Sequence, residues 1–229
     1  MKAPVERLHS EDPIRKVTGM PHYKSPLMKE NGFAVLRPFT KPVPDEEYLG
    51  LDYMDWASGG DTNFAPIASA LGQMECHGFW EEGKPDKDGI WTKNAEVCPT
   101  LVDWTERVGA RYGRVRTIML RPNTEEEAIR NLHPDDNNRL NPDDEGWVVR
   151  AWLQLTDNPN SYMILRESKD DAASEQRIPL PAGAQFIVDS ERLHHAVWHP
   201  GPEPRYALIV SFESGPALDE WIRAEAPIV

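Results

Sequence analysis

The sequence has few cysteines, no long hydrophobic run and fewer basic than acidic residues. Its two cysteines, Cys76 and Cys98, are too few for a disulfide framework and lack the spacing of a zinc site. We expect both thiols to be buried and reduced, as in a cytoplasmic protein. No segment approaches the roughly 18 apolar residues of a membrane-spanning helix, and the first residues lack the apolar region of a signal peptide. A soluble, cytoplasmic protein without a membrane partner is expected.

The charge balance argues against a further class of partner. Lys and Arg number 25 against 38 Asp and Glu, which gives a net charge of −13 at pH 7. Binding of nucleic acids requires a basic surface for the phosphates, so no nucleic-acid partner is expected. A local arginine cluster can still bind an anionic small-molecule substrate. The oligomeric state is not determined by any of these features.

The hydrophobic pattern divides the chain into three parts of one domain, residues 1–229. The length suffices for a substantial core, and the hydrophobic content of 39% with eight Trp predicts a folded protein. Residues 1–113 are expected to form helices and covering loops. Residues 114–213 are expected to form a β-barrel core, and residues 214–229 a carboxyl-terminal helix.

The pattern of the amino-terminal part predicts helices, short strands and loops. Leu101, Trp104 and Val108 follow the helical period, and Gly113 stands where that helix would end. Asp45 is a good capping residue for an earlier helix. The predicted segments are an extended or poorly ordered lead-in over 1–25, a strand over 32–37, a helix over 45–56, glycine-rich covering loops with short strands over 58–97, and a helix over 100–112.

After residue 113 the pattern changes to short segments rich in β-branched and aromatic residues. Turns containing Pro, Gly or Asn separate these segments. Such a series predicts a mainly β fold with flanking α-helices, in which the core is a sandwich or jelly roll. The predicted strands cover 115–121, 147–155, 162–165, 177–180, 185–188, 195–198 and 206–212, and a closing helix covers 218–226.

One group of residues has the chemistry of a metal site. His133 and Asp135 form a His-x-Asp pair, and His195 follows about 60 residues later. Residues i and i+2 of an extended segment point to the same side, so this pair can contact one ion. Two imidazoles and one carboxylate suit non-haem Fe(II) with open coordination positions. Two alternatives remain: the His-Pro-Asp-Asp sequence is also typical of a solvated turn, and His194 and His195 could be packing residues on a strand.

Three further features follow one another near the carboxyl terminus: Asp189-Ser190, then His195-Ala196-Val197-Trp198, then Arg205 ten residues after His195. Together they resemble the aspartyl/asparaginyl β-hydroxylase-like branch of the Fe(II)/2-oxoglutarate-dependent oxygenases, over roughly residues 114–213. The resemblance implies a double-stranded β-helix, a cupin-like jelly roll. It also implies Fe(II) as cofactor and 2-oxoglutarate as cosubstrate.

The resemblance assigns a role to five residues. It implies that His133, Asp135 and His195 bind the iron and are the catalytic residues. Adjacent strand residues face opposite sides, so only one of His194 and His195 can reach the ion. The resemblance selects His195. Arg205 is implied to hold the distal carboxylate of 2-oxoglutarate, for which a guanidinium fork is well suited, and Arg150 to assist it.

The expected function is therefore an Fe(II)- and 2-oxoglutarate-dependent dioxygenase. It would use O₂ to hydroxylate a C–H bond of a small amino acid or amino-acid derivative. Asp135 as the carboxylate ligand favours hydroxylation over halogenation, which needs that position open for a halide. Three alternatives stay open: a hydroxylase of Asp or Asn residues in a protein, a cupin-like metalloprotein that does not use 2-oxoglutarate, and a non-catalytic binding module.

A last group of residues is basic. Arg111, Arg114, Arg116 and Arg121 are expected to form a solvated strand edge. As an alternative, Arg116 or Arg121 contacts an anionic group of the substrate.

Overall fold

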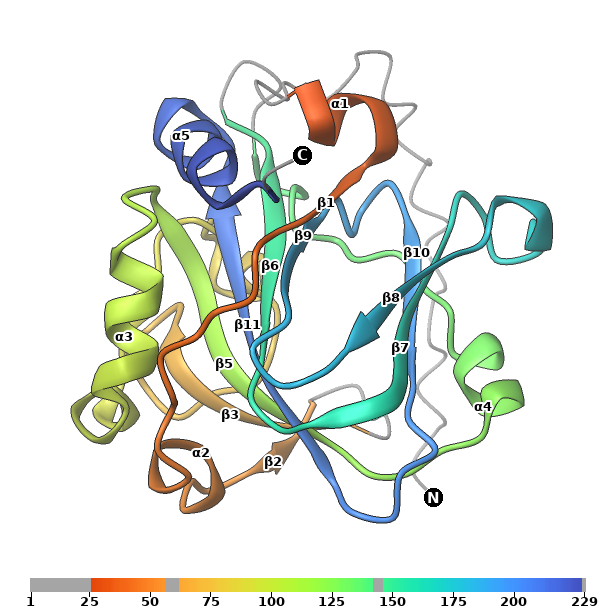
Figure 1. Ribbon diagram of the computed structural model, residues 1–229. Coiled ribbons are helices and arrows are strands. Elements are labelled where there is room, and N and C mark those ends of the chain that lie inside the picture. Colours follow the sequence, from red (N-terminus) through yellow and green to blue (C-terminus); the bar gives the residue numbers. More distant parts are fainter. Residues whose placement is uncertain (1–25, 57–61, 142–145, 228–229) are drawn as a thin grey trace, which may run out of the picture.

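The computed structural model describes residues 26–56, 62–141 and 146–227, which form two β-sheets with short flanking helices (Figure 1). The lead-in expected for residues 1–25 lies outside the described residues. The strands are β1 (Phe33–Val35), β2 (Met54–Asp55), β3 (Thr62–Ser69), β4 (Ile90–Trp91), β5 (Tyr112–Leu120), β6 (Val148–Gln154), β7 (Asn158–Arg166), β8 (Gln176–Leu180), β9 (Gln185–Val188), β10 (His194–Trp198) and β11 (Arg205–Glu213). The helices are α1 (Pro26–Asn31), α2 (Glu46–Leu49), η1 (Phe79–Glu82), η2 (Lys93–Val97), α3 (Pro99–Glu106), α4 (Glu125–Arg130), η3 (Ala172–Ser174) and α5 (Pro216–Glu225).

The larger sheet has the strand order β1-β9-β6-β11-β5-β3-β2, with β4 paired to β3, and the smaller sheet has the order β10-β7-β8. The pairings in both sheets are antiparallel. All seven strands predicted after residue 113 are present, and the predicted mainly β fold with flanking helices is confirmed. The amino-terminal part also contributes β1 and β3 to the larger sheet, on either side of the predicted core strands (Figure 1).

Alternation along the strands separates two hydrophobic clusters. In β6, Trp152 points into the space between the sheets, whereas Leu153 points to the outer face of the larger sheet. The inner cluster combines residues of both sheets, among them Phe186 of β9 and Met163 of β7, so the sheets face each other across it. The interior of this barrel is therefore packed from two sides.

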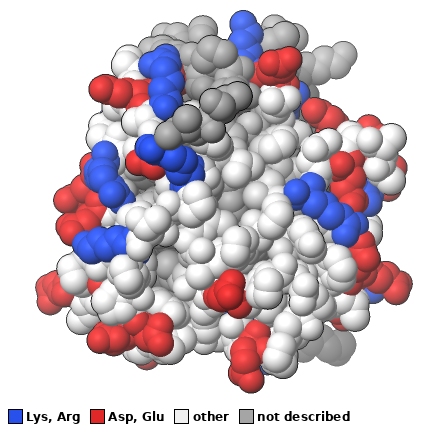
Figure 2. Space-filling model, in the orientation of Figure 1, with Lys and Arg blue, Asp and Glu red and all other residues white. Residues whose placement is uncertain are grey.

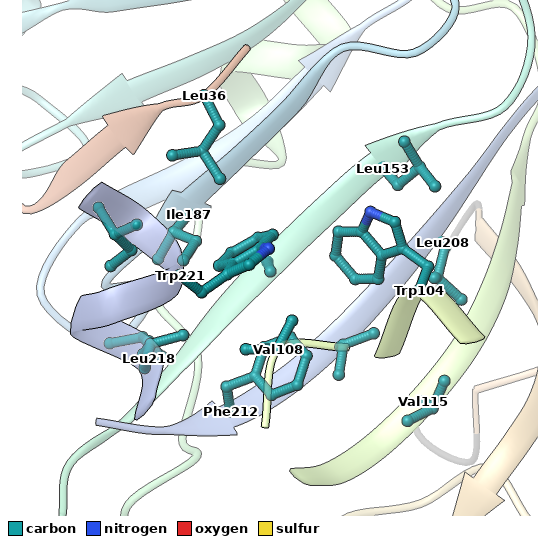
Figure 3. Packing of buried hydrophobic residues seen from close by; sticks show 14 of the residues in the cluster. Leu36, Trp104, Val108, Val115, Leu153, Ile187, Leu208, Phe212, Leu218 and Trp221 are labelled. Atoms are coloured by element: carbon teal, nitrogen blue, oxygen red, sulfur yellow. The ribbon is translucent and has the colours of Figure 1, made fainter. Parts of the chain in front are cut away.

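The outer face of the larger sheet is covered by α3 and α5 (Figure 3). Trp104 of α3 and Trp221 of α5 meet edge to face at 5.6 Å between ring centroids, and both lie against Phe212 of β11. Burying one large apolar side chain of this kind contributes about 1.5–3 kcal/mol. The buried Glu47 carboxylate accepts the Leu101 N–H at the first turn of α3, where the helix dipole favours an anion. This layer supports the sheet from behind and leaves its inner face for other contacts.

Two predicted helices are shorter than expected. The helix predicted over 45–56 ends at Leu49, and β2 follows it. The helix predicted over 100–112 ends at Glu106 because the positive φ of 71° at Gly109 turns the chain out of the helix. Gly113 lies in β5 and caps no helix: a Cβ there would stand 2.1 Å from the Asp86 carbonyl oxygen. The backbone of Asp86 leaves no room for a side chain at this position, which explains why residue 113 is glycine.

In the segment predicted as loops and short strands over 58–97, the described residues form β3, β4, η1 and η2, and the eight-residue β3 is longer than the short strands expected. Sequence reasoning also missed α4, which has a capping box: the Glu127 N–H donates to Thr124 Oγ1 at 3.2 Å, and Glu127 in turn accepts the Thr124 N–H at 2.8 Å. The Thr-x-x-Glu spacing is a readable signal for such a helix start. Among the described residues, no helix has the length and apolar character to cross a bilayer.

Candidate metal centre

His133 and His195 face each other in a short backbone pairing between the segment after α4 and strand β10. The His195 N–H donates to the His133 carbonyl oxygen at 2.9 Å, and the reverse hydrogen bond measures 3.4 Å. The Asp135 N–H donates to the Ser190 carbonyl oxygen at 2.7 Å. These bonds fix the His-x-Asp segment beside the strand that carries the third residue. One ligand atom from each of His133, Asp135 and His195 then lies within 4.8 Å of the other two.

Both imidazoles have their Nε2 atoms available. His133 Nδ1 lies 2.8 Å from the Asn131 carbonyl oxygen, and His195 Nδ1 lies 3.4 Å from the Leu193 carbonyl oxygen. A carbonyl oxygen only accepts, so each Nδ1 carries the proton and each Nε2 keeps its lone pair. His195 Nε2 is 3.8 Å from Asp135 Oδ2, so both atoms border the space that a shared metal ion would occupy. The donor set therefore fits a metal ion.

The pKa shifts of His195 and Asp135 keep these two side chains in the forms that bind a metal. Burial lowers the pKa of His195 to about 4, so its imidazole is neutral at pH 7. Burial alone would raise the pKa of Asp135, but the nearby Arg150 guanidinium and the other groups around the carboxylate together outweigh burial and hold that pKa below its usual range. Metal binding requires a neutral imidazole and an ionised carboxylate, and the site has both before any ion binds.

His195 faces the barrel interior, whereas His194 faces the opposite side of β10. The His195 ring lies edge to face with Trp152, with 5.8 Å between centroids, and is 7% exposed. The next residue, Ala196, packs on the other face in a small cluster with Ala128 of α4. The structure thus places His195 at the cluster and His194 away from it.

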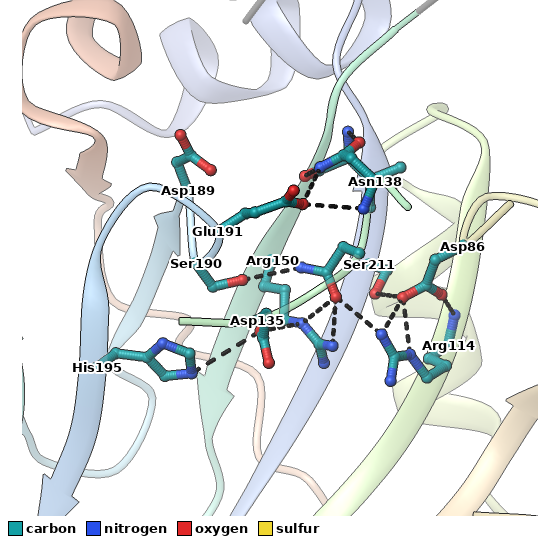
Figure 4. A network of polar contacts seen from close by, with 12 residues as sticks. Asp86, Arg114, Asp135, Asn138, Arg150, Asp189, Ser190, Glu191, His195 and Ser211 are labelled. Carbon is teal, nitrogen blue, oxygen red and sulfur yellow. Dashed lines mark hydrogen bonds and ion pairs between the residues drawn. The ribbon is translucent and has the colours of Figure 1, made fainter. Parts of the chain in front are cut away.

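Arg150 of β6 lies directly behind the carboxylate (Figure 4). Its Nε is 2.7 Å from Asp135 Oδ2, and its Nη2 donates to Asn137 Oδ1 at 2.6 Å. Asn137 Oδ1 also accepts from Arg114 Nη2 at 2.8 Å, and Asn137 Nδ2 donates to Ser190 Oγ at 2.9 Å. The structure therefore brings Arg150 to the metal cluster; its assistance to 2-oxoglutarate stays a prediction.

Asp86 completes this network from a loop far away in the sequence. Its carboxylate accepts from Arg114 Nε at 2.7 Å, from the Arg114 backbone N–H at 2.8 Å and from Ser211 Oγ at 2.9 Å. The Arg114 guanidinium outweighs burial and holds the pKa of Asp86 below its usual range. Sequence reasoning missed Asp86 and Asn137, because no local pattern marks either residue.

The expectation of a solvated strand edge is wrong for two of the four arginines. Arg114 and Arg116 are 9% and 8% exposed, whereas Arg111 and Arg121 are exposed. The alternation of β5 places Arg114 and Arg116 on the same inner face as Ile118, which packs in the inner cluster. The sequence did contain a signal for this: Arg114 and Arg116 are spaced at i, i+2 with the interior Ile118, which predicts that all three face the same side of the strand.

Arg205 begins β11 and is fully buried. Its Nε donates to Gln154 Oε1 at 2.9 Å, but Nη1 and Nη2 have no hydrogen-bond partner among the described residues. Burial lowers the pKa of Arg205 to about 9, with no compensating acidic neighbour in the described part of the chain. A buried guanidinium is costly without an anion, and its planar fork matches a carboxylate.

No family model matches the sequence, and no curated protein matches it either. Among solved structures, an oxidoreductase of the 2OG-Fe(II) oxygenase family from Burkholderia pseudomallei is similar over 84% of this chain and 90% of its own, at 12% identity and a TM-score of 0.51. The fold is a double-stranded β-helix. The likeness shows this fold alone, because the identity is low.

Two further structures are similar at lower TM-scores. A prolyl hydroxylase from Trichoplax adhaerens, solved with a peptide fragment of the hypoxia inducible factor oxygen degradation domain, has a TM-score of 0.47 at 15% identity over 88% of this chain and 90% of its own. A prolyl-4-hydroxylase from Pseudomonas putida has a TM-score of 0.44 at 13% identity over 82% of this chain and 96% of its own. The conclusion that the fold is a double-stranded β-helix rests on the Burkholderia pseudomallei structure.

Proposed function

We propose that this chain is an Fe(II)- and 2-oxoglutarate-dependent dioxygenase that hydroxylates a C–H bond of a small amino acid or amino-acid derivative. One observation carries the proposal: inside one barrel, a two-histidine, one-carboxylate cluster lies together with a fully buried arginine that lacks a counter-ion among the described residues. The cluster suits non-haem iron, and the arginine requires an anion. Both together favour an iron enzyme with an anionic cosubstrate.

His133, Asp135 and His195 are the proposed iron ligands and catalytic residues. Three ligands on one face leave positions opposite them for other molecules. The backbone pairing of the two histidines sets their orientation in advance. Arg150 holds the Asp135 carboxylate at 2.7 Å, and partners of this kind orient metal ligands in other proteins.

Iron bound there would supply the activation of O₂, coupled to oxidative decarboxylation of 2-oxoglutarate to succinate and CO₂. The protein binds and orients the reactants. Arg205 is proposed to hold the distal carboxylate of 2-oxoglutarate through Nη1 and Nη2, while Gln154 fixes the guanidinium by accepting from Nε. Trp152 and Phe186, stacked at 5.4 Å between centroids, form an apolar wall beside the cluster that excludes water. Arg150 is proposed to assist in holding the cosubstrate.

We further infer that the chain belongs to the aspartyl/asparaginyl β-hydroxylase-like branch of these oxygenases. The support is the Asp-Ser pair of the resemblance, which has contacts at the site. The Ser190 carbonyl oxygen accepts the Asp135 N–H. Asp189 accepts from Trp147 Nε1 at 3.2 Å, and burial raises its pKa to about 7. The pair thus fixes the chain next to the carboxylate ligand.

Aerobic incubation with Fe(II), 2-oxoglutarate and a panel of free amino acids is expected to release succinate in a one-to-one ratio with a hydroxylated amino acid. Matched reactions without 2-oxoglutarate, or with Zn(II) in place of Fe(II), should release none. Succinate released only with peptides that contain Asp or Asn would favour a protein hydroxylase. Iron binding without any consumption of 2-oxoglutarate would favour a cupin-like metalloprotein that does not use it.

A further inference from the structure

Arg116 is a second buried guanidinium without a counter-ion. It is 8% exposed, and its Nε and Nη1 have no hydrogen-bond partner among the described residues. Its Cζ lies 4.6 Å from the Trp56 ring centroid and 4.3 Å from that of Phe64. These two centroids are only 5.5 Å apart, so both rings lie on one flank of the guanidinium. The aromatic rings hold the guanidinium in place and leave Nε and Nη1 without a partner in the described part of the chain.

The charges around Arg116 do not balance. Arg114 is paired with Asp86, and Arg150 is paired with Asp135. Both of these guanidiniums are close enough to Arg116 to lower its pKa, together with burial, which is the largest cause. Asp86 and Asp135 thus pair with the other two guanidiniums, and Arg116 has no ion-pair partner among the described residues.

The same pocket contains an unpaired acid. Its lining includes Arg114 and Arg116 of β5 together with Glu75, Cys76 and His77. Glu75 Oε1 accepts the Leu71 N–H at 2.8 Å, but Glu75 Oε2 is buried without a hydrogen-bond partner in the described part of the chain. No ion pair joins Glu75 to Arg116 in the described residues, so each keeps a free atom for a ligand. Such a pocket presents one cationic and one anionic group.

The strand register places Arg116 at the level of the metal cluster. Arg116 lies opposite Ile209, and Ile209 lies opposite Trp152, the residue in contact with His195. Arg116 is therefore two strand spacings, about 10 Å, from Trp152 on the same inner face. Arg205 lies opposite Leu120, four residues or about 13 Å further along β5. The two unpaired guanidiniums thus occupy different levels, and each can bind its own carboxylate.

We propose that Arg116 and Glu75 bind the zwitterionic head group of a free amino acid, with its carboxylate on Arg116 and its ammonium group on Glu75 Oε2. The proposal deepens, and rests on, the proposed function, in which the iron site lies on the same inner face as Arg116 and at the same level along the strands. An internal residue of a peptide has neither a free α-carboxylate nor a free α-ammonium group. The pocket therefore favours a free amino acid over a residue within a protein.

Binding without turnover provides the test. The wild-type protein, loaded with Mn(II) and 2-oxoglutarate under nitrogen, is mixed with each of the twenty protein amino acids, and its melting temperature is recorded. At least one amino acid is expected to raise the melting temperature by about 5 °C at saturation. Its N-acetyl and carboxamide derivatives, each lacking one charge, should bind at least about 10-fold more weakly.

Two variants identify the residues. Arg116→Gln is expected to weaken binding of the amino acid by about 10- to 100-fold. The same variant should also lose the preference for the amino acid over its carboxamide, because the carboxylate no longer has its partner. Glu75→Gln should abolish the preference for the free amine over the N-acetyl form. Arg130→Gln and Glu126→Gln, which change exposed residues of the same types, serve as matched controls and should bind as the wild type does.

The outcomes separate this proposal from the one on which it rests. If no free amino acid binds, or if the derivatives bind as well as the parent compound in the wild type, the head-group site is wrong even if 2-oxoglutarate is consumed with another substrate. If Arg116→Gln weakens binding of 2-oxoglutarate and not of the amino acid, Arg116 belongs to the cosubstrate. Binding that depends on both Arg116 and Glu75 without any succinate release would support the head-group site and reject the oxygenase.

Discussion

Replacing His195 with alanine is expected to weaken iron binding by at least about 100-fold, while replacing His194 leaves it nearly unchanged. Loss of a partner that merely orients a metal ligand costs about 10- to 100-fold in affinity, so loss of a ligand costs more. His195 faces the cluster with its Nε2 free, whereas His194 lies on the other face of β10. Bound iron is measured after anaerobic equilibration of the metal-free proteins with Fe(II).

The two substitutions are matched in size and in position on one strand, so a general effect on folding would appear in both. Asp135→Asn is a useful third variant because it keeps the shape of the side chain and removes the charge. It should lose iron as His195→Ala does, and it leaves Arg150 without its ion-pair partner. Equal loss of iron in both histidine variants would mean that the ion binds elsewhere.

Replacing Arg205 with methionine is expected to weaken binding of 2-oxoglutarate by about 30- to 5000-fold. Removing one partner of a buried, hydrogen-bonded charge pair costs about 2–5 kcal/mol, which corresponds to that range. The same substitution should leave the unliganded protein at least as stable as the wild type, because it removes a buried charge that has no counter-ion in the described residues. Few binding residues combine these two effects.

The measurement is the melting temperature with Mn(II), recorded along a titration with 2-oxoglutarate. Arg121→Met, at an exposed arginine, is the matched control and should follow the wild-type curve. A purely structural Arg205 would give the opposite pattern. The methionine variant would then melt lower without ligand and would bind 2-oxoglutarate normally.

Local patterns sufficed for the strands but not for the helix ends. Strand β9 was predicted with its observed bounds because a short run of apolar and β-branched residues lies between turn residues. The end of α3 was missed because Tyr112 continues the helical period although it lies in β5. Periodicity does not distinguish a helix that continues from a strand that begins on the same hydrophobic positions.

The proposed iron ligands were accessible from sequence because their types and spacing carry chemistry. The interior arginines were not, because their state depends on partners far away in the chain. Arg114 is paired with Asp86, and Asn137 connects Arg114 to Arg150, through contacts that no local window contains. Only the assembled barrel shows that Arg116 is left without such a partner among the residues that the structure describes. The charge of an arginine can be read from a sequence, but whether that charge is matched cannot.

The most direct test is anomalous diffraction at the iron edge, from crystals grown without oxygen in the presence of Fe(II) and 2-oxoglutarate. We predict a single strong peak within coordination distance of His133, Asp135 and His195, with the distal carboxylate of 2-oxoglutarate on the terminal nitrogens of Arg205. A peak at any other position, or iron at this cluster with 2-oxoglutarate bound away from Arg205, would contradict the proposed site.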